Sequence, residues 1–365
     1  MTADPDQGNR REDRAHDRRH GRVAIVVGLA CALTLAVVGS LVRHEPTPRG
    51  DDLIYEKIAT HPFATHTYSF AFRIGLPLLV HVLPFSHTAS FLLLAWLATG
   101  VAGAFAYLLL RHFGTSQRLA TMLAIALSVS PPLLIVSIRD GRNTDAASVM
   151  ILMAATFFAV KRRSLPLGAT LLIGATIRES TLFMIPFTYA LWARGWWDPR
   201  VAARIAALAL PAVALFVALH VALPTVGKQQ VSGYSGGIVG GRLTVIRNGL
   251  KGGTTEFRRL FSIYGPLWIS APLALLTMSF ARRGLVLILC CVAAMTVALD
   301  WGRVILLAAP VFYPAAGHVL SRHLRWQVAT LVTFAFLIIG YAVYMDHSGV
   351  RTGIIDQAPP AYPVR

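Results

Sequence analysis

The sequence predicts an all-α, polytopic integral membrane protein with about nine to eleven transmembrane helices. Of its 365 residues, 55% are hydrophobic and only 14% are charged, whereas soluble domains carry about 25% charged residues. Apolar runs of spanning length recur along the chain, and basic residues gather in the connections between them. We therefore attribute the formal charge of +17 to membrane topology and contacts with lipid headgroups, and predict no nucleic-acid partner.

A helix needs about 17–25 residues to span a bilayer. Apolar candidates run over 23–43, 88–110, 119–138, 145–160, 165–177, 180–193, 203–223, 262–280, 284–300, 303–320 and 325–344. The first follows a polar tail at 1–22 and is too long for the core of a signal peptide, so we expect an uncleaved helix. The short segments 165–177 and 180–193 form either two helices, giving eleven spans, or a re-entrant pair, giving nine.

The distribution of Lys and Arg predicts the orientation in the plasma membrane. The short connections assigned to the cytoplasm contain only one acid, Asp198, among many basic residues. These basic residues are Arg111, Arg118, Lys161, Arg162, Arg163, Arg194, Arg200, Arg204, Arg282, Arg283, Arg322 and Arg325. This positive-inside pattern places the N-terminus in the cytoplasm and the C-terminal tail, 345–365, on the extracytoplasmic side.

Residues 23–344 are expected to form a single transmembrane domain with long outer loops at about 44–87 and 224–261. The first of these loops contains a moderately apolar stretch from Tyr68 to Phe85. If this stretch spanned the membrane, every later loop would change sides and the positive-inside pattern would be lost. We therefore expect it to lie on the outer surface.

Acidic residues beyond position 50 concentrate on the predicted outer face. Asp51 and Asp52 follow the first helix, and a pair of adjacent carboxylates can supply a general base or a metal ligand. The alternative is a solvated loop or a cap for a helix beginning near Leu53, since Asp is a favoured N-cap residue.

A second outer connection contains Arg139, Asp140, Arg142 and Asp145. Asp145 opens the next helix, where its charge favours the N-terminal dipole. Capping explains Asp145 and leaves the other three unexplained, so this connection is a candidate binding site.

Two more connections combine an acid with an arginine. Arg178 and Glu179 interrupt an apolar stretch, where charges cost a few kcal/mol each and are functional candidates; the alternative is a mutually neutralising pair. Asp300 and Arg303 flank a tight turn and could form a self-contained ion pair. The case for function rests on the convergence of four such connections on one face.

The second long loop is basic, and Arg242 is among the residues that could hold an anionic headgroup such as phosphate. Cys31, Cys290 and Cys291 lie inside apolar segments and are expected to be packing residues. The sequence has no CxxC or HExxH motif, so we predict no metal ligands and no certain cofactor. A divalent cation is compatible with the acids but is not required.

This arrangement resembles the GT-C class of polytopic glycosyltransferases. The resemblance covers about 23–320 and rests on the first helix, the acidic pair Asp51-Asp52, the surface segment 73–80 and the turn Arg178-Glu179. Larger members carry a C-terminal soluble domain that we do not expect here, which leaves acceptor recognition open.

The resemblance implies transfer of a sugar from a polyprenyl-phosphate donor to a glycan or lipid acceptor of the cell envelope, on the extracytoplasmic face. Asp51 or Asp52 would be the general base, and arginines would bind the phosphate. The full set of expected substrate-binding residues is Arg73, Arg139, Asp140, Arg142, Asp145, Arg178, Glu179, Arg242, Asp300 and Arg303.

Two other functions fit a polytopic protein. A transporter or flippase of an anionic lipid or solute predicts charges near helix midpoints and broken helices in two repeats, whereas the charges here gather at one face and a single segment is broken. A non-catalytic scaffold of envelope assembly predicts that the loss of single carboxylates is harmless.

Overall fold

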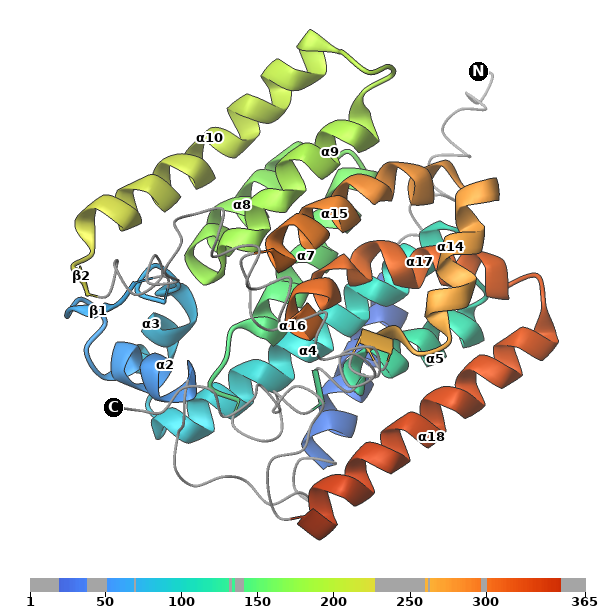
Figure 1. Ribbon diagram of the computed structural model, residues 1–365, viewed down its shortest axis with the longest axis horizontal. Helices are drawn as coiled ribbons and strands as arrows, with labels where there is room; N and C mark the ends of the chain where they lie inside the picture. Colours follow the sequence, from blue (N-terminus) through green and yellow to red (C-terminus); the bar gives the residue numbers. More distant parts are fainter. Residues whose placement is uncertain are drawn as a thin grey trace, which may run out of the picture.

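The chain folds into a bundle of helices (Figure 1). The computed structural model describes residues 20–37, 51–68, 70–130, 133–134, 141–226, 260–261, 263–296 and 301–348. Within these ranges, the only strands are β1 (His66–Thr67) and β2 (Thr225–Val226). The predicted all-α class is confirmed.

In the described part of the chain, four helices are long and apolar enough to cross a membrane: the N-terminal helix (His20–Val37), α4 (His87–His112), α10 (Pro199–Ala222) and the run Trp301–Leu320. The other helices that overlap the predicted apolar segments are α5 (Gln117–Ser128), α7 (Asp145–Val160), α8 (Ser164–Ile177), α9 (Met184–Trp192), α14 (Leu267–Thr277), α15 (Ser279–Met295) and α18 (Leu324–Ser348). Each predicted apolar segment thus contains a helix, as a membrane protein requires.

The run Trp301–Leu320 lies in the middle of the bundle, where most of its residues are buried. It consists of α16 (Trp301–Ile305), the 3₁₀ turn η2 (Leu306–Ala308) and α17 (Ala309–Leu320). Pro310, at the start of α17, has no backbone N–H to donate to the preceding turn. The run therefore changes helix type just before this proline.

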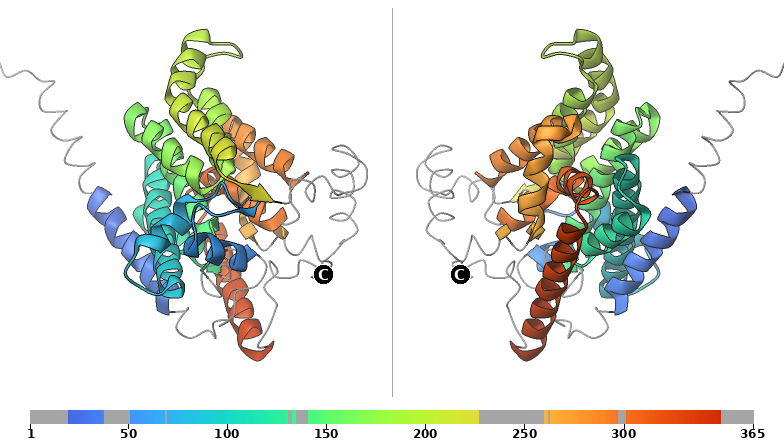
Figure 2. Two further views of the ribbon diagram at one scale, coloured as in Figure 1. Left: turned by 90° about the vertical axis from the view of Figure 1, so that its left-hand side faces the viewer. Right: turned by 90° about the vertical axis from the view of Figure 1, so that its right-hand side faces the viewer.

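The N-terminal helix packs closely against α4, and the two lie side by side in both views of Figure 2. Gly28 and Gly100 face each other at the crossing. A Cβ atom added at Gly100 would lie 2.8 Å from the Gly28 carbonyl oxygen and 2.9 Å from the Ala32 Cβ atom. Small residues of this kind let membrane helices approach through their backbones.

We expect Gly100→Ala to lower the free energy of unfolding by about 1–3 kcal/mol, because rigid atoms on both sides leave no room for a methyl group. Gly168→Ala is the matched control, since its Cβ would meet Leu208 at an ordinary 3.7 Å. Thermal unfolding of the purified variants in detergent would measure the difference. Equal melting temperatures for both variants would contradict the tight crossing.

The short helices α8 and α9 both run alongside α7. Ser164 begins α8 just after α7 ends at Val160, and the Trp192 Nε1 atom at the end of α9 donates to the Ala159 carbonyl oxygen at 2.7 Å. Their connection, the 3₁₀ turn η1 (Glu179–Phe183), therefore lies at the other end of α7. Helix α8 thus runs from the end of α7 to its start, and α9 runs back along α7 to its end.

The predicted first outer loop contains two short helices, α2 (Asp51–Thr60) and α3 (Gly75–Val82). At eight residues, α3 is far too short to span a membrane, and the surface position expected for this segment stays a prediction. Its Leu76 and Val80 are buried, and it contacts α2, α4 and α8. Strand β1 pairs with β2 in parallel, which ties this loop to the end of α10.

Candidate active site

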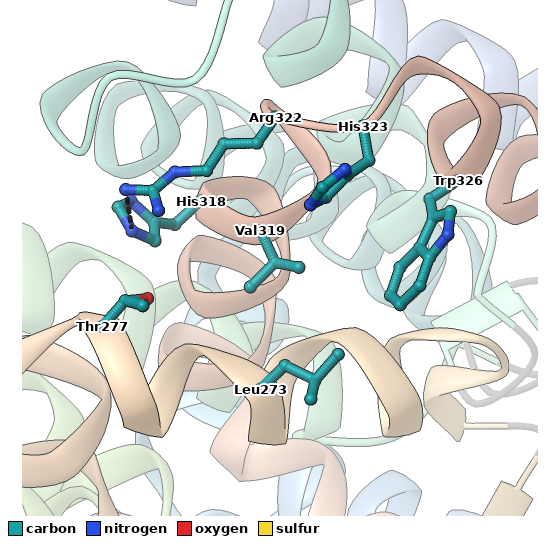
Figure 3. A pocket seen from close by; sticks show the side chains of 7 residues that line it. All are labelled: Leu273, Thr277, His318, Val319, Arg322, His323 and Trp326. Atoms are coloured by element: carbon teal, nitrogen blue, oxygen red, sulfur yellow. Dashed lines mark hydrogen bonds between the residues drawn. The ribbon is translucent and has the colours of Figure 1, made fainter.

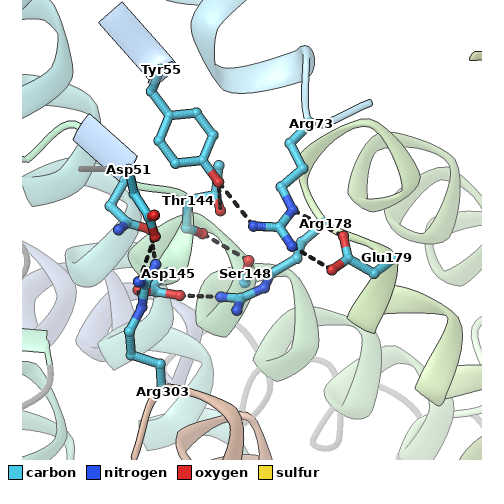
Figure 4. A network of polar contacts seen from close by, with 10 residues as sticks. Asp51, Tyr55, Arg73, Thr144, Asp145, Ser148, Arg178, Glu179 and Arg303 are labelled. Carbon is cyan, nitrogen blue, oxygen red and sulfur yellow. Dashed lines mark hydrogen bonds and ion pairs between the residues drawn. The ribbon is translucent and has the colours of Figure 1, made fainter. Parts of the chain in front are cut away.

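Arg303, in α16, is the centre of a network of charged side chains at the start of α7 (Figure 4). Its Nε donates to Oδ2 of Asp145 at 2.5 Å. Its Nη1 donates to Oδ2 of Asp51 at 2.9 Å, and its Nη2 donates to Oδ1 of Asn143 at 2.7 Å. Asp51 opens α2 and Asp145 opens α7, so three distant segments meet at one guanidinium group.

A second arginine, Arg178, forms an ion pair with the other carboxylate oxygen of Asp145. The side chain of Asp145 is only 2% exposed, and that of Arg178 is 9% exposed. A carboxylate this deeply buried is stable as an anion only when it is paired. Arg178, Arg303 and the N-terminal dipole of α7 together provide that compensation.

The carboxylate of Glu179 pairs with Arg73, which precedes α3. The Arg73 Nε and Nη2 atoms donate to the two carboxylate oxygens at 3.0 and 2.5 Å. The third nitrogen, Nη1, donates to the Tyr55 hydroxyl at 3.1 Å, and that hydroxyl lies 3.2 Å from Oγ1 of Thr144. Arg73 thereby links the first loop to both the η1 turn and the start of α7.

Glu179 lies in η1, with its side chain 46% exposed. Desolvation raises the pKa of its carboxyl group, but the charge and hydrogen bonds of Arg73 lower it by more, so the pKa falls below its ordinary value. Glu179 therefore remains an anion at neutral pH. Three arginines and three carboxylates thus oppose each other in the network: Arg73, Arg178, Arg303, Asp51, Asp145 and Glu179.

A second, neighbouring network is built around Glu56. Its Oε2 accepts from Nε of Arg142 at 2.8 Å, and its Oε1 lies 3.0 Å from Nδ1 of His87. Arg142 also donates to Oγ1 of Thr88 at 2.7 Å. These contacts join α2, the connection before α7 and the start of α4, and so fix the orientation of α2, which carries Asp51.

The structure brings six of the expected site residues into the main network: Asp51, Arg73, Asp145, Arg178, Glu179 and Arg303. Asp52 stands beside Asp51 in the first turn of α2, and Arg142 lies in the neighbouring network. The remaining expected residues, Arg139, Asp140, Arg242 and Asp300, lie outside the described residues.

Neighbours in sequence do not pair as their order suggested. Arg178 and Glu179 do not form a mutually neutralising pair, because Arg178 pairs with Asp145 and Glu179 pairs with Arg73. Arg303 pairs with Asp145 and Asp51 across the bundle, while its expected partner Asp300 lies outside the described residues. These residues connect segments and do more than cap local turns.

The sequence interpretation missed Asn143, Tyr55 and Glu56 as members of the networks. Tyr55 follows Asp51 by four residues, one helical turn, and this spacing could have placed it on the same face of α2. Asn143 lies in the candidate connection between Arg142 and Asp145, but its contact with Arg303, 160 residues away, could not be predicted from local sequence.

A pocket of about 170 Å³ lies far from both networks, between α14, α17 and α18 (Figure 3). Its lining includes His318, Arg322 and Trp326, and an Arg322 nitrogen lies 3.2 Å from Nε2 of His318. Arg303 stands near the beginning of the helical run Trp301–Leu320, and this pocket stands at its end. The pocket therefore does not belong to the candidate active site.

No protein family model matches the chain, and no curated protein matches its sequence. Its structure is similar to a crystal structure of the Archaeoglobus fulgidus oligosaccharyltransferase in complex with Zn and sulfate. The TM-score is 0.51 and the identity 13%, with 88% of this chain and 52% of that chain covered.

The chain has the GT-C fold. A second structure, of the archaeal oligosaccharyltransferase AglB from Archaeoglobus fulgidus with an inhibitory peptide and a dolichol-phosphate, matches with a TM-score of 0.47 and 13% identity. That match covers 88% of this chain and 55% of that chain. The chain thus spans about half the length of the solved GT-C chains that it matches.

Proposed function

We propose that the protein is a membrane glycosyltransferase that moves a sugar from a polyprenyl-phosphate donor to a hydroxyl group of a cell-envelope acceptor. The observation that supports this most strongly is the convergence of Asp51, Asp145, Arg178 and Arg303 at one end of a GT-C helical bundle. Such a donor keeps its lipid tail in the bilayer, so the site needs no soluble nucleotide-binding domain.

Asp51 is the better candidate for the general base. Its side chain is 38% exposed and contacts one guanidinium group, whereas Asp145 is 2% exposed and pairs with two. A base must reach the acceptor hydroxyl, which favours the exposed carboxylate. Asp145 then serves to position the arginines. Asp52, the adjacent residue in α2, is the alternative base.

In the proposed reaction, the acceptor oxygen attacks the anomeric carbon of the sugar and the bond from that carbon to the phosphate oxygen breaks. Asp51 accepts the hydroxyl proton, and polyprenyl phosphate leaves. Protonation of Asp51 removes one negative charge beside Arg303 at the moment when the leaving phosphate gains one. The arginines can then stabilise the leaving group by charge-assisted hydrogen bonds.

Arg73, Arg178 and Arg303 are the candidate phosphate ligands. Each guanidinium group carries five N–H donors, so its ion pair with a carboxylate does not use all of them. The sulfate in the Archaeoglobus fulgidus structure is a tetrahedral anion of the same kind as a phosphate. The Zn in that structure raises a separate question, whether a divalent cation acts here too.

The distribution of basic residues supports an extracytoplasmic site. The end of the bundle opposite the network carries the predicted cytoplasmic connections, including Arg163 after α7 and Arg282 early in α15. The positive-inside rule keeps such connections in the cytoplasm. The network then faces the other side, where envelope acceptors are assembled.

Turnover by the purified protein in lipid, with a panel of radiolabelled polyprenyl-phosphate sugars and an envelope-lipid extract as acceptor, tests this function. We expect label to move from at least one donor to an acceptor, with release of polyprenyl phosphate. Labelled lipid that crosses sealed vesicles unchanged, without transfer, would instead support a flippase. Absence of both transfer and transport would favour the scaffold.

A further inference from the structure

Three side-chain oxygens surround the guanidinium group of Arg303. They belong to Asp51, Asp145 and Asn143, and they lie 2.9, 2.5 and 2.7 Å from three different nitrogens. Two carboxylates and an amide carbonyl are the ligand types that Mg²⁺, Mn²⁺ and Ca²⁺ prefer in proteins. Here, each of these oxygens accepts a hydrogen bond from an arginine.

The oxygens do not suit a divalent cation while Arg303 keeps this position. A metal ion bound to the same oxygens would lie within a few ångströms of the guanidinium charge, and like charges at that distance repel strongly in a partly buried site. The Arg303 side chain is only 13% exposed, and its neighbours Gly302 and Val304 are buried. The guanidinium group therefore cannot easily turn away to make room.

We infer that Arg303 is the built-in cation of this site and occupies the oxygen ligands that a divalent metal ion would otherwise bind. The fixed charge of Arg303 holds Asp51 and Asp145 together, which is the role a metal ion plays in an oxygen-lined site. Two consequences follow: the protein binds no divalent cation there, and sugar transfer proceeds without one. The second consequence rests on the proposed function, and the first does not.

The inference predicts that removal of the guanidinium group creates a metal site. Arg303→Ala would leave Asp51, Asp145 and Asn143 around an open space, with Arg178 still paired to Asp145. We expect this variant to bind roughly one Mn²⁺ per protein with a Kd on the order of 10⁻⁴ M, as in weak sites with few charged ligands. Asn143 would supply the third oxygen.

Titration of the detergent-purified protein with Mn²⁺, with free Mn²⁺ followed by electron paramagnetic resonance, tests this without any turnover. We expect no stoichiometric binding to the wild type, binding to Arg303→Ala, and at least about a tenfold loss of that binding in Arg303→Ala/Asp51→Asn. A folded Arg303→Ala variant without Mn²⁺ binding would overturn the inference. So would binding to the wild type that Asp51→Asn abolishes, a measurement that does not depend on the stability of the Arg303 variant.

Activity gives a second test once a donor is known. We expect the rate of wild-type transfer to be unchanged by excess EDTA. Loss of transfer in EDTA, with recovery on addition of Mg²⁺, Mn²⁺ or Zn²⁺, would overturn the metal-free site and leave the proposed glycosyl transfer intact. Failure of transfer with every donor would instead count against the proposed function and leave the Mn²⁺ results unaffected.

Discussion

Asp51→Asn is expected to reduce the rate of sugar transfer by roughly 10²–10⁴-fold, the contribution of a general base. The substitution keeps the shape of the side chain and an oxygen that can accept from Arg303, but it removes the basic carboxylate. Because Asp51 is 38% exposed, the loss of its charge should disturb folding little. Single-turnover kinetics with a radiolabelled donor would measure the rate, and thermal unfolding would confirm the fold.

Asp198→Asn is the matched control for this experiment. Asp198 caps α10 by accepting from the Val201 backbone N–H at 3.2 Å, and Asn caps helices about as well as Asp. Its turnover should equal that of the wild type. Asp52→Asn distinguishes the two candidate bases, because it should retain most of the activity if Asp51 is the base. Full activity in Asp51→Asn would exclude Asp51 from this role.

Asp145→Asn is expected to destabilise the folded protein by about 3–5 kcal/mol, the cost of removing one partner from a buried ion pair. The variant would leave Arg178 and Arg303, at 9% and 13% exposure, without their shared carboxylate. We expect a large drop in melting temperature and in the yield of monodisperse protein. Intrinsic fluorescence of detergent-purified samples would report the unfolding.

A double-substitution cycle tests whether the charge itself causes this loss. Arg178→Gln combined with Asp145→Asn should recover part of the stability that either substitution loses alone, because the two charges are removed together. Strictly additive losses would mean that Asp145 and Arg178 are not coupled. A stable Asp145→Asn variant would contradict the proposed role of Asp145 in holding the network.

Hydropathy predicted the helical segments of this protein well, because a membrane requires long apolar helices. The orientation expected from the charge rule stays a prediction. The ends of the helices were predicted less well. The segment expected at 262–280 contains α14, which ends at Thr277, and α15 begins directly at Ser279. The expected boundary was placed at Arg282 and Arg283, but these arginines lie inside the N-terminal part of α15.

The sequence predicted that charged residues gather at one face, and the structure brings Asp51, Asp145, Arg178 and Arg303 together, but the sequence did not predict how they pair. Acids and arginines on one predicted face were sufficient to indicate Asp51, Asp145, Arg178 and Arg303. Their pairing depends on how the helices pack, which local sequence does not encode. Adjacent charges such as Arg178 and Glu179 therefore looked like partners, although each bonds to another segment.

The long sequence separations within the network have a consequence for biosynthesis. Asp145 is 33 residues from Arg178, 158 residues separate it from Arg303, and 252 residues separate Asp51 from Arg303. During synthesis, Asp145 can pair with Arg178 early, whereas Asp51 can pair with Arg303 only after most of the chain has been made. Because Asp51 and Asp145 lie at helix ends, their carboxylates can stay hydrated until Arg303 has been synthesised and completes the network.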